Sequence, residues 1–276
     1  MRILVTGGTG HLGRAVVRLL GQDGHTVRVL ARHLGTTPGV EWARGDLATG
    51  EGVERAVAGA QVLVHAATNS PAARRGRFRA VDFVRSPSDV DLRGTQALLT
   101  AAEKASVQHF IHVSIVGLEH MARLPYSRVK LEAEEIVRAS AVPWSIVRAT
   151  GFYWLMERML ADLVTRPLPM LPSQVRMQSV DSDDFARFVV ACVSDGERGE
   201  RPDFVGPEVL TMREMAEQYM AARDVHRRIR NAPMPRRVQA ALTRANTSNS
   251  RLHGATTWGA WLAQTSEGPD GRRLAA

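Results

Sequence analysis

The sequence predicts an α/β fold, with a doubly wound parallel sheet covered by helices on both faces and a smaller, mostly helical part after it. Short apolar runs alternate with helical patterns through the first 150 residues, which is typical of βαβ units. A glycine-rich stretch follows the first apolar run. Beyond residue 150 the strand patterns give way to helical ones.

Six apolar runs are the expected strands. The run at 62–66 has no polar alternation, as expected for a strand that is covered on both faces. Helical patterns between the runs supply the crossovers that parallel strands need. The expected strands are residues 2–6, 26–30, 40–43, 61–66, 108–114 and 144–148. The expected helices are residues 12–20, 52–58, 90–105 and 127–139.

The later part of the chain predicts four more helices, at 152–164, 181–193, 211–222 and 258–262. Thr211 and Glu214 have the spacing of a capping box. We therefore expect residues 1–150, with 174–200 returning to them, to form the sheet domain. We expect residues 151–173 and 201–265 to form the smaller part, and 266–276 to be a disordered tail. The connection at 69–88 is long for a compact domain, so it is either a solvated loop or a lid.

Composition excludes several classes of protein. The net charge is +8, but the arginines are scattered and not interleaved with aromatic residues, so we expect no nucleic-acid partner. No run of eighteen apolar residues occurs, which predicts no membrane span. The first expected strand starts at Arg2, which leaves no room for a signal peptide. The single cysteine, Cys192, lies in an apolar stretch and predicts a buried side chain in a cytoplasmic protein. We expect a monomer or homodimer with no metal.

The stretch TGGTGHLG at 6–13 follows the first expected strand and opens a helix. Glycines at these spacings permit a tight turn, let the backbone approach a pyrophosphate and pack the helix against the strand. The helix directs its free N–H groups towards the anion. The context predicts dinucleotide binding, although His11 could equally be an exposed turn residue. The loop residues expected at the cofactor are Gly7, Thr9, Gly10, His11, Leu12 and Gly13.

The end of the second expected strand indicates which dinucleotide binds. NAD-specific folds place an acidic residue there, to accept a hydrogen bond from the ribose 2′-OH. This chain has no acid there and instead continues into Arg32. An arginine can pair with a 2′-phosphate through two hydrogen bonds. The sequence therefore favours NADP(H) over NAD(H), with an ordinary surface arginine as the alternative for Arg32.

Tyr126 and Lys130 in YSRVK are separated by one helical turn. An ammonium beside a phenol lowers the phenol's pKa, which would make Tyr126 a workable proton donor or acceptor. Ser114 ends the fifth expected strand, where its hydroxyl could bind the reacting oxygen. The spacing also fits an amphipathic helix with a surface lysine. However, Lys104 and Lys130 are the only lysines in the chain, so the placement of Lys130 favours a function.

Together these motifs resemble the short-chain dehydrogenase/reductase superfamily, and most closely its atypical, NmrA-like NAD(P)-binding branch. The resemblance rests on TGGTGHLG, GDL at 45–47, HAAT at 65–68, Ser114, YSRVK and SIVRATGF at 145–152, and it covers about residues 1–230. It implies a Rossmann-type sheet and further cofactor contacts. These contacts are Asp46, Leu47, Ala66, Ala67, Thr68, Lys130, Ala149, Thr150 and Gly151. One departure is that Ser114 is followed by Ile115, where the pattern has a second serine.

Phe152, Tyr153 and Trp154 stand in a row after the sixth expected strand, followed by Met156. Three successive residues cannot share one face of a helix, so at least one should point towards the cleft. Because ligand pockets are lined by apolar and aromatic groups, we expect these four residues to line a pocket for a planar, aromatic or quinone-like substrate. Core packing of the helix is the alternative.

The sequence thus predicts an NADPH-dependent oxidoreductase that reduces a carbonyl, enone or quinone of a small molecule, with Tyr126 as proton donor. Two other functions stay open. A non-catalytic, NmrA-like regulator would bind NAD(P) without turnover, since the branch includes such proteins. An epimerase or dehydratase would keep its cofactor bound and unconsumed.

Overall fold

A computed structural model describes residues 1–69, 88–196 and 198–266. Its centre is a seven-stranded sheet in the order β3-β2-β1-β4-β5-β6-β9, in which every pairing is parallel. The strand order reverses between β1 and β4, and open sheets of this kind bind ligands beyond the carboxyl ends of their strands at such a point. The strands are β1 (Arg2–Thr6), β2 (Thr26–Ala31), β3 (Val40–Arg44), β4 (Val62–His65), β5 (His109–Ile115), β6 (Trp144–Ala149) and β9 (Gly199–Glu200).

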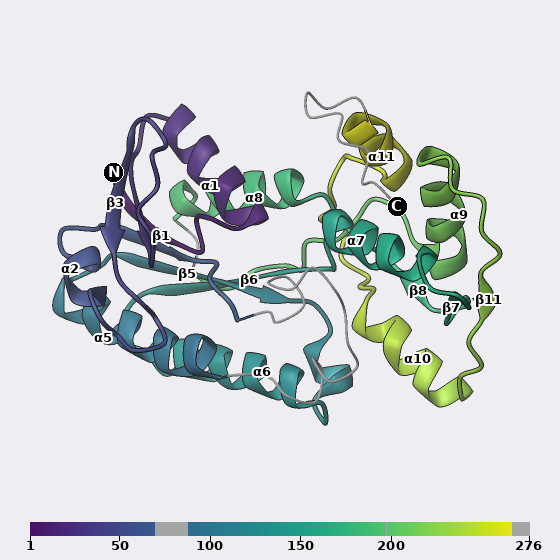
Figure 1. Cartoon of the computed structure of the whole chain (residues 1–276). Helices are drawn as coiled ribbons and strands as arrows, with labels where there is room; N and C mark the ends of the chain where they lie inside the picture. Colours follow the sequence, from purple (N-terminus) through teal and green to yellow (C-terminus); the bar gives the residue numbers. More distant parts are fainter. Residues whose placement is uncertain (70–87, 197, 267–276) are drawn as a thin grey trace.

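Helices cover both faces of this sheet, which confirms the predicted doubly wound, Rossmann-type fold (Figure 1). One face carries α1 (His11–Gln22) and α8 (Ser182–Ser194). The other carries α2 (Val53–Val57), α5 (Thr95–Lys104) and α6 (Pro125–Arg138). Each layer encloses its own apolar core, one around Val5 and Val64 and the other around Leu4 and Leu63. Successive residues of β1 and β4 thus point to opposite faces, as expected of buried strands.

The six expected strands are present with their ends shifted by at most one residue. The seventh, β9, has two residues and was too short to predict from an apolar run. The helix expected at 90–105 differs from the prediction. It begins as a π-helical turn, η1 (Asp89–Gly94), before α5. A short 3₁₀ turn, η2 (Leu118–Met121), precedes α6, which starts at a proline, where a missing N–H costs nothing.

The C-terminal part contains α7 (Tyr153–Val164), α9 (Met212–Ala222), α10 (Arg236–Ala245) and α11 (Trp258–Ser266). Two small ribbons accompany them. Strands β7 (Met170–Leu171) and β11 (Arg230–Asn231) form one, and β8 (Arg176–Met177) and β10 (Leu210–Thr211) form the other. A third apolar core, around Tyr153, Leu160 and Trp258, holds this part together. The predicted capping box is confirmed at the start of α9.

In the residues that the structure describes, no helix combines the length and apolarity needed to cross a bilayer. Cys192 is buried in the core beneath α8, as predicted. The possible lid lies almost entirely at 70–87, and the expected tail almost entirely at 267–276. Both segments are outside the described residues.

Candidate active site

The glycine loop between β1 and α1 can be built only with glycine at two positions. Gly7 has a φ of +75°, and a Cβ added there would lie 2.6 Å from the carbonyl carbon of Ala66. A Cβ on Gly13 would lie 2.0 Å from the carbonyl oxygen of Gly7. The loop therefore folds tightly against both the end of β4 and the first turn of α1, as a pyrophosphate-binding turn requires.

The first turn of α1 is available to an anion. Its N-cap is Gly10, which has no side chain to cap the helix, and no acidic residue stands in the first turn. The first backbone N–H groups of a helix have no partners inside the helix, and they carry the positive end of the helix dipole. The geometry of the loop and this helix end fit the pyrophosphate of a dinucleotide.

The other predicted cofactor residues lie at or just after the carboxyl ends of four strands. They are Arg32 after β2, Asp46 and Leu47 after β3, Ala66, Ala67 and Thr68 after β4, and Ala149, Thr150 and Gly151 at the end of β6. Arg32 is exposed. The Asp46 carboxylate accepts a hydrogen bond from the backbone of Ala48, and Leu47 is buried in the sheet core. All of them therefore lie along the carboxyl edge of the sheet, where folds of this kind bind ligands.

Lys130 forms a buried ion pair that the sequence did not reveal. Its Nζ lies 2.5 Å from Oδ1 of Asp91 in η1 and 2.5 Å from Oγ1 of Thr68. The two charged side chains are only 6% and 4% exposed. Asp91 also accepts hydrogen bonds from the Thr68 hydroxyl and the Asn69 backbone. Lys130 is therefore held at the end of β4, in contact with Thr68, one of the residues that the family resemblance places at the cofactor.

The electrostatics of Lys130 and Asp91 follow from this contact. Burial lowers the pKa of Lys130, but the Asp91 carboxylate, together with Tyr126 and Glu134, outweighs burial and the net pKa is raised. Burial likewise raises the pKa of Asp91, but Lys130 and the hydrogen bonds from Asn69 and Thr68 lower it overall. Both groups are therefore charged at neutral pH, and each depends on the other.

Tyr126 lies one turn before Lys130 on α6, as the spacing predicted. The predicted direction of its pKa was wrong. Burial raises the pKa of Tyr126, Lys130 lowers it by a smaller amount, and Asp91 raises it again, so the net pKa is above the usual value. The sequence showed the ammonium but neither the burial nor the carboxylate beside it. At neutral pH the side chain is a phenol, which suits a proton donor.

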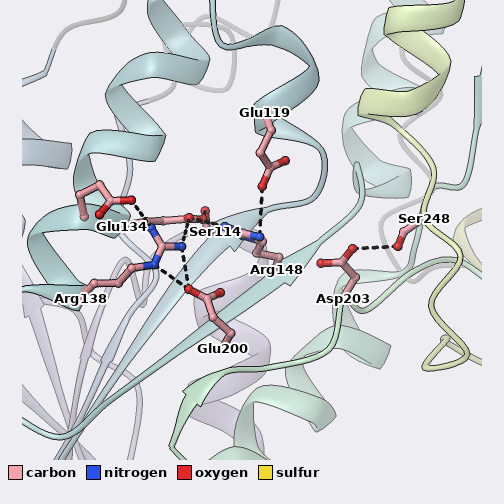
Figure 2. A network of polar contacts seen from close by, with 9 residues as sticks. Ser114, Glu119, Glu134, Arg138, Arg148, Glu200, Asp203 and Ser248 are labelled. Atoms are coloured by element: carbon pink, nitrogen blue, oxygen red, sulfur yellow. Dashed lines mark hydrogen bonds and ion pairs between the residues drawn. The ribbon is translucent and has the colours of Figure 1, made fainter.

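Ser114 lies at the end of β5, and its described hydrogen bond goes to Glu134 on α6, one helical turn beyond Lys130. Its hydroxyl donates to Oε1 of Glu134 at 2.6 Å, and both side chains are buried (Figure 2). The role predicted for Ser114 at the reacting oxygen stays a prediction. In the structure its hydroxyl instead ties β5 to α6.

Glu134 is the centre of a buried charge network (Figure 2). It is fully buried, and its carboxylate accepts hydrogen bonds from Arg148 on β6 and from Arg138 on α6. Arg138 continues to Glu200 on β9 at 2.7 Å. Burial raises the pKa of Glu134, but the hydrogen bonds from Arg148 and Ser114 lower it overall. The network joins α6 to β5, β6 and β9, one helical turn beyond Lys130.

Two buried histidines lie beside the Lys130–Asp91 pair. His65 is within hydrogen-bond distance of Thr6 at 2.7 Å and of Thr95 at 3.0 Å, and Thr95 donates to the backbone carbonyl of Asp91. The ring of His112 lies 5.3 Å from that of His65, centroid to centroid. Among the described residues, neither nitrogen of His112 has a hydrogen-bond partner. Burial and the charge of Lys130 lower the pKa of His112 to about 3.

The four residues predicted to line a substrate pocket separate in the structure. Trp154 stacks on His11 of the glycine loop, with 4.2 Å between ring centroids and 11° between planes. Tyr153 is instead a core residue. It packs against Trp258, and its hydroxyl donates to the carbonyl of Thr256. The alternative of core packing therefore holds for Tyr153, because the first residue of α7 faces the C-terminal core.

The other two predicted pocket residues, Phe152 and Met156, also pack against neighbouring side chains. Phe152 is half-buried with its ring 6.0 Å from that of Phe185, and Met156 is 7% exposed in the third core. Of the four, Trp154 alone contacts a predicted cofactor residue through a described ring interaction. It brings α7 against the first turn of α1.

Comparison with known proteins agrees with this geometry. The sequence profile of a family described as NAD(P)H-binding matches residues 7–196, which include the glycine loop, Tyr126 and Lys130. This chain belongs to that NAD(P)H-binding family.

Relatives of the chain include proteins named as assembly factors and proteins named as reductases. It is 29% identical over 197 residues to the photosystem II assembly factor Ycf39 of Cyanophora paradoxa, a match that spans 69% of this chain and 58% of that protein. It is 31% identical over 229 residues to the (4-alkanoyl-5-oxo-2,5-dihydrofuran-3-yl)methyl phosphate reductase of Streptomyces griseus, covering 78% of this chain and 72% of that protein. The chain thus matches somewhat less than two thirds of the length of Ycf39.

Solved structures share the fold at low identity. A nucleoside-diphosphate-sugar epimerase from Staphylococcus aureus superposes with a TM-score of 0.75 at 18% identity, covering 95% of this chain and 100% of that one. The NADPH-dependent quinone oxidoreductase QOR2 of Escherichia coli, solved with NADPH, gives a TM-score of 0.70 at 14% identity, covering 95% and 99%. At these identities the likeness establishes a Rossmann-like α/β fold.

Sequence reasoning missed Asp91 and Glu134. A signal for Glu134 was present, because it follows Lys130 by four residues and so shares a helix face with Tyr126 and Lys130. Asp91 stands 39 residues before Lys130, and only the tertiary position of η1 brings the two together.

Proposed function

We propose that this protein is an NADPH-dependent reductase that transfers hydride to a carbonyl, enone or quinone of a small, planar molecule. The observation that carries the proposal is the pair Tyr126 and Lys130, one turn apart on α6 and held at the carboxyl end of β4 by Asp91. The reductase relative from Streptomyces supports the reaction class. We further propose that the protein acts in the cytoplasm as a monomer or homodimer, without nucleic-acid or membrane partners.

The reaction needs a hydride, a proton, and a cofactor and substrate that are held in fixed positions. When bound, the nicotinamide supplies the hydride to the electrophilic carbon. Tyr126 holds a proton, because its raised pKa keeps the phenol neutral at pH 7, and it gives that proton to the substrate oxygen, or to the carbon α to the carbonyl of an enone. A proton from water then restores the phenol. Lys130 stabilises the transient phenolate and, as the family resemblance implies, binds the cofactor ribose, a role that its contact with Thr68 after β4 supports.

The preference for NADPH rests on the end of β2. Arg32 follows the last residue of this strand and is exposed to solvent, which leaves its guanidinium able to pair with a 2′-phosphate through two hydrogen bonds. A carboxylate at this position would repel that phosphate. We expect Arg32→Glu to reverse the preference, so that NADH binds more tightly than NADPH in a fluorescence titration.

The test of the reaction uses Tyr126→Phe. We expect the wild-type protein to consume NADPH with at least one member of a carbonyl, enone and quinone panel. We expect the variant to lose about a hundredfold to ten-thousandfold in kcat, while its NADPH affinity changes little. Wild-type turnover in the variant would refute the role of Tyr126. Consumption of NADH in preference to NADPH would refute the role of Arg32.

A second function is favoured by a different observation. The relative from Cyanophora is named as an assembly factor and not as an enzyme, and the Lys130 ammonium is already bound to Asp91 and Thr68. A regulator that binds NAD(P) would show similar affinity for oxidised and reduced cofactor and no turnover across the panel. An epimerase or dehydratase would instead carry a nicotinamide cofactor through purification and leave it unconsumed.

A further inference from the structure

The C-terminal part contains a cavity of about 520 Å³, a size that is common for small-molecule sites. It lies between α9 and the ribbon of β7 and β11. The residues that line it come from α9, from β7 and the stretch after it, and from the segment that leads into β11. None of them belongs to the predicted cofactor or catalytic residues. In Figure 1, α7 lies between these elements and the seven-stranded sheet.

The charge of this cavity is unbalanced. Four arginines line it against a single acid, Glu217, which lies 3.7 Å from Arg213. Arg227 donates to the backbone carbonyl of Arg166, a neutral acceptor that does not balance the arginine's charge. Arg228 and Arg230 are exposed, and no ion pair is found for either within the described parts of the chain. Most of the positive charge at this cavity therefore lacks a counter-ion of the protein's own.

The floor of the cavity is ordered by polar contacts. Ser173 is 1% exposed, its hydroxyl accepts a hydrogen bond from Arg213, and its backbone N–H donates to the side chain of Asn231. These contacts join α9, the residues after β7 and β11. Arg213 on α9 and Arg230 on β11 are therefore carried on elements that are fixed to one another, and a ligand would not have to bring these two arginines together.

The same cavity has an apolar side. Leu171 is buried, and Met220 and Ile229 are partly buried in the third core. A ligand that fills the cavity would therefore place an anionic group against the arginines and an apolar group against these side chains. Guanidinium groups bind phosphate oxygens through paired, charge-assisted hydrogen bonds. An ester of phosphate with a small apolar alcohol has both groups.

We propose that this cavity is a second ligand site, which binds the phosphate ester of a small organic molecule away from the dinucleotide crevice. The phosphate lies between Arg228 and Arg230. Arg213, which donates a hydrogen bond to Ser173, supplies a third guanidinium group. The organic group lies over Met220 and Ile229. The site has its own arginines and shares no residue with the cofactor loop, so it does not depend on the reductase reaction.

Calorimetric titration with phenyl phosphate, in saturating NADP⁺ to occupy the cofactor loop, tests this site. The double variant Arg228→Gln/Arg230→Gln removes the two unpaired charges. Its matched control is Arg236→Gln/Arg237→Gln, which removes the same charge from exposed positions on α10. We expect the cavity variant to bind phenyl phosphate at least about tenfold more weakly, and the control to bind within about twofold of wild type. A thermal melt of each variant confirms that it is folded.

Titrations with other anions distinguish a site for an organic phosphate ester from other causes of binding. Inorganic phosphate should bind at least about tenfold more weakly than phenyl phosphate, because it leaves the apolar side empty. Equal affinity for the two would overturn the organic ester as the ligand. Equal weakening in both double variants would show general attraction to a basic protein and overturn the site, as would the absence of binding to the wild type up to about 10 mM. Binding of an acidic peptide with none of phenyl phosphate would also overturn it.

Discussion

The ammonium of Lys130 and the carboxylate of Asp91 lie 2.5 Å apart, and both are almost fully removed from water. Each charge in such a pair is stable in the interior only because the other is present. The pair also fixes the lysine that the proposed reaction needs, since Asp91 and Thr68 together determine where its Nζ lies. A contact between η1 and α6 thus links the stability of the fold to its chemistry.

Replacing Asp91 by Asn should destabilise the protein strongly. The amide keeps the shape of the side chain but leaves the charge of Lys130 buried without compensation, which costs about 3–5 kcal/mol. The measurement is the free energy of unfolding in urea at pH 7. Asp89→Asn is the matched control, because Asp89 pairs with Arg93 at the surface and such pairs contribute about 0–1 kcal/mol. Equal losses in the two variants would contradict the importance of the buried pair.

The pH dependence of this difference has a definite sign. Because the folded-state pKa of Asp91 is lowered, its contribution is present above its unfolded pKa of about 4 and is lost as the pH falls through the folded value. Because that of Lys130 is raised, its contribution is present below about 10.4 and is lost as the pH rises through the folded value. The gap between wild type and Asp91→Asn should therefore be widest near neutral pH and narrow at both ends.

The fold was predictable because its signals are local. The glycine turn between β1 and α1 is encoded within eight consecutive residues, and the apolar runs of buried strands need no partner to be recognised. The candidate site was predictable only in part. Tyr126 and Lys130 share a helix and so could be paired from their spacing, whereas Asp91 reaches Lys130 through the placement of a π-helical turn. The pKa of Tyr126 was predicted in the wrong direction because burial is a tertiary property.

Replacing His112 by Leu should stabilise the protein, and more so in acid. The histidine stays neutral in the fold, with its pKa lowered from 6.5 to about 3, whereas the unfolded chain takes up a proton below about pH 6.5. The wild type therefore loses about 1.4 kcal/mol per pH unit through this group as the pH falls below that value. Leucine removes the loss, and also removes two buried nitrogens that lack partners in the described structure.

Urea unfolding at pH 7, 6 and 5 measures this effect. The stability of His112→Leu relative to wild type should rise steadily from pH 6 to pH 5. Parallel stability curves over this range would show that His112 takes up a proton in the folded protein as well as in the unfolded chain. That outcome would contradict the lowered pKa. A large loss at pH 7 would show that the ring makes a hydrogen bond that leucine cannot replace.

Replacing Glu134 by Gln should destabilise the protein, because the charges of two arginines depend on the Glu134 carboxylate. Glu134 is fully buried and accepts from Ser114, Arg138 and Arg148. Loss of its charge leaves Arg148, the more buried of the two arginines, without its main counter-ion, at a cost of about 3–5 kcal/mol. The matched control is Glu135→Gln on the same helix, since the side chain of Glu135 is 72% exposed. The measurement is the free energy of unfolding of the two variants in urea at pH 7. Similar losses of stability in both would contradict the importance of the buried network.

Trp154 should report cofactor binding through its fluorescence. Its indole stacks on His11, and His11 belongs to the loop that the pyrophosphate is expected to contact. Binding of NADP⁺, which does not absorb the emitted light, should therefore change the surroundings of this ring more than those of Trp144, at the far end of β6. We expect Trp154→Phe to lose most of the fluorescence change on NADP⁺ addition, and Trp144→Phe to keep it. The phenyl ring preserves part of the stacking, so the stability cost should stay near 1 kcal/mol. An unchanged response in Trp154→Phe would place the cofactor away from this end of α1.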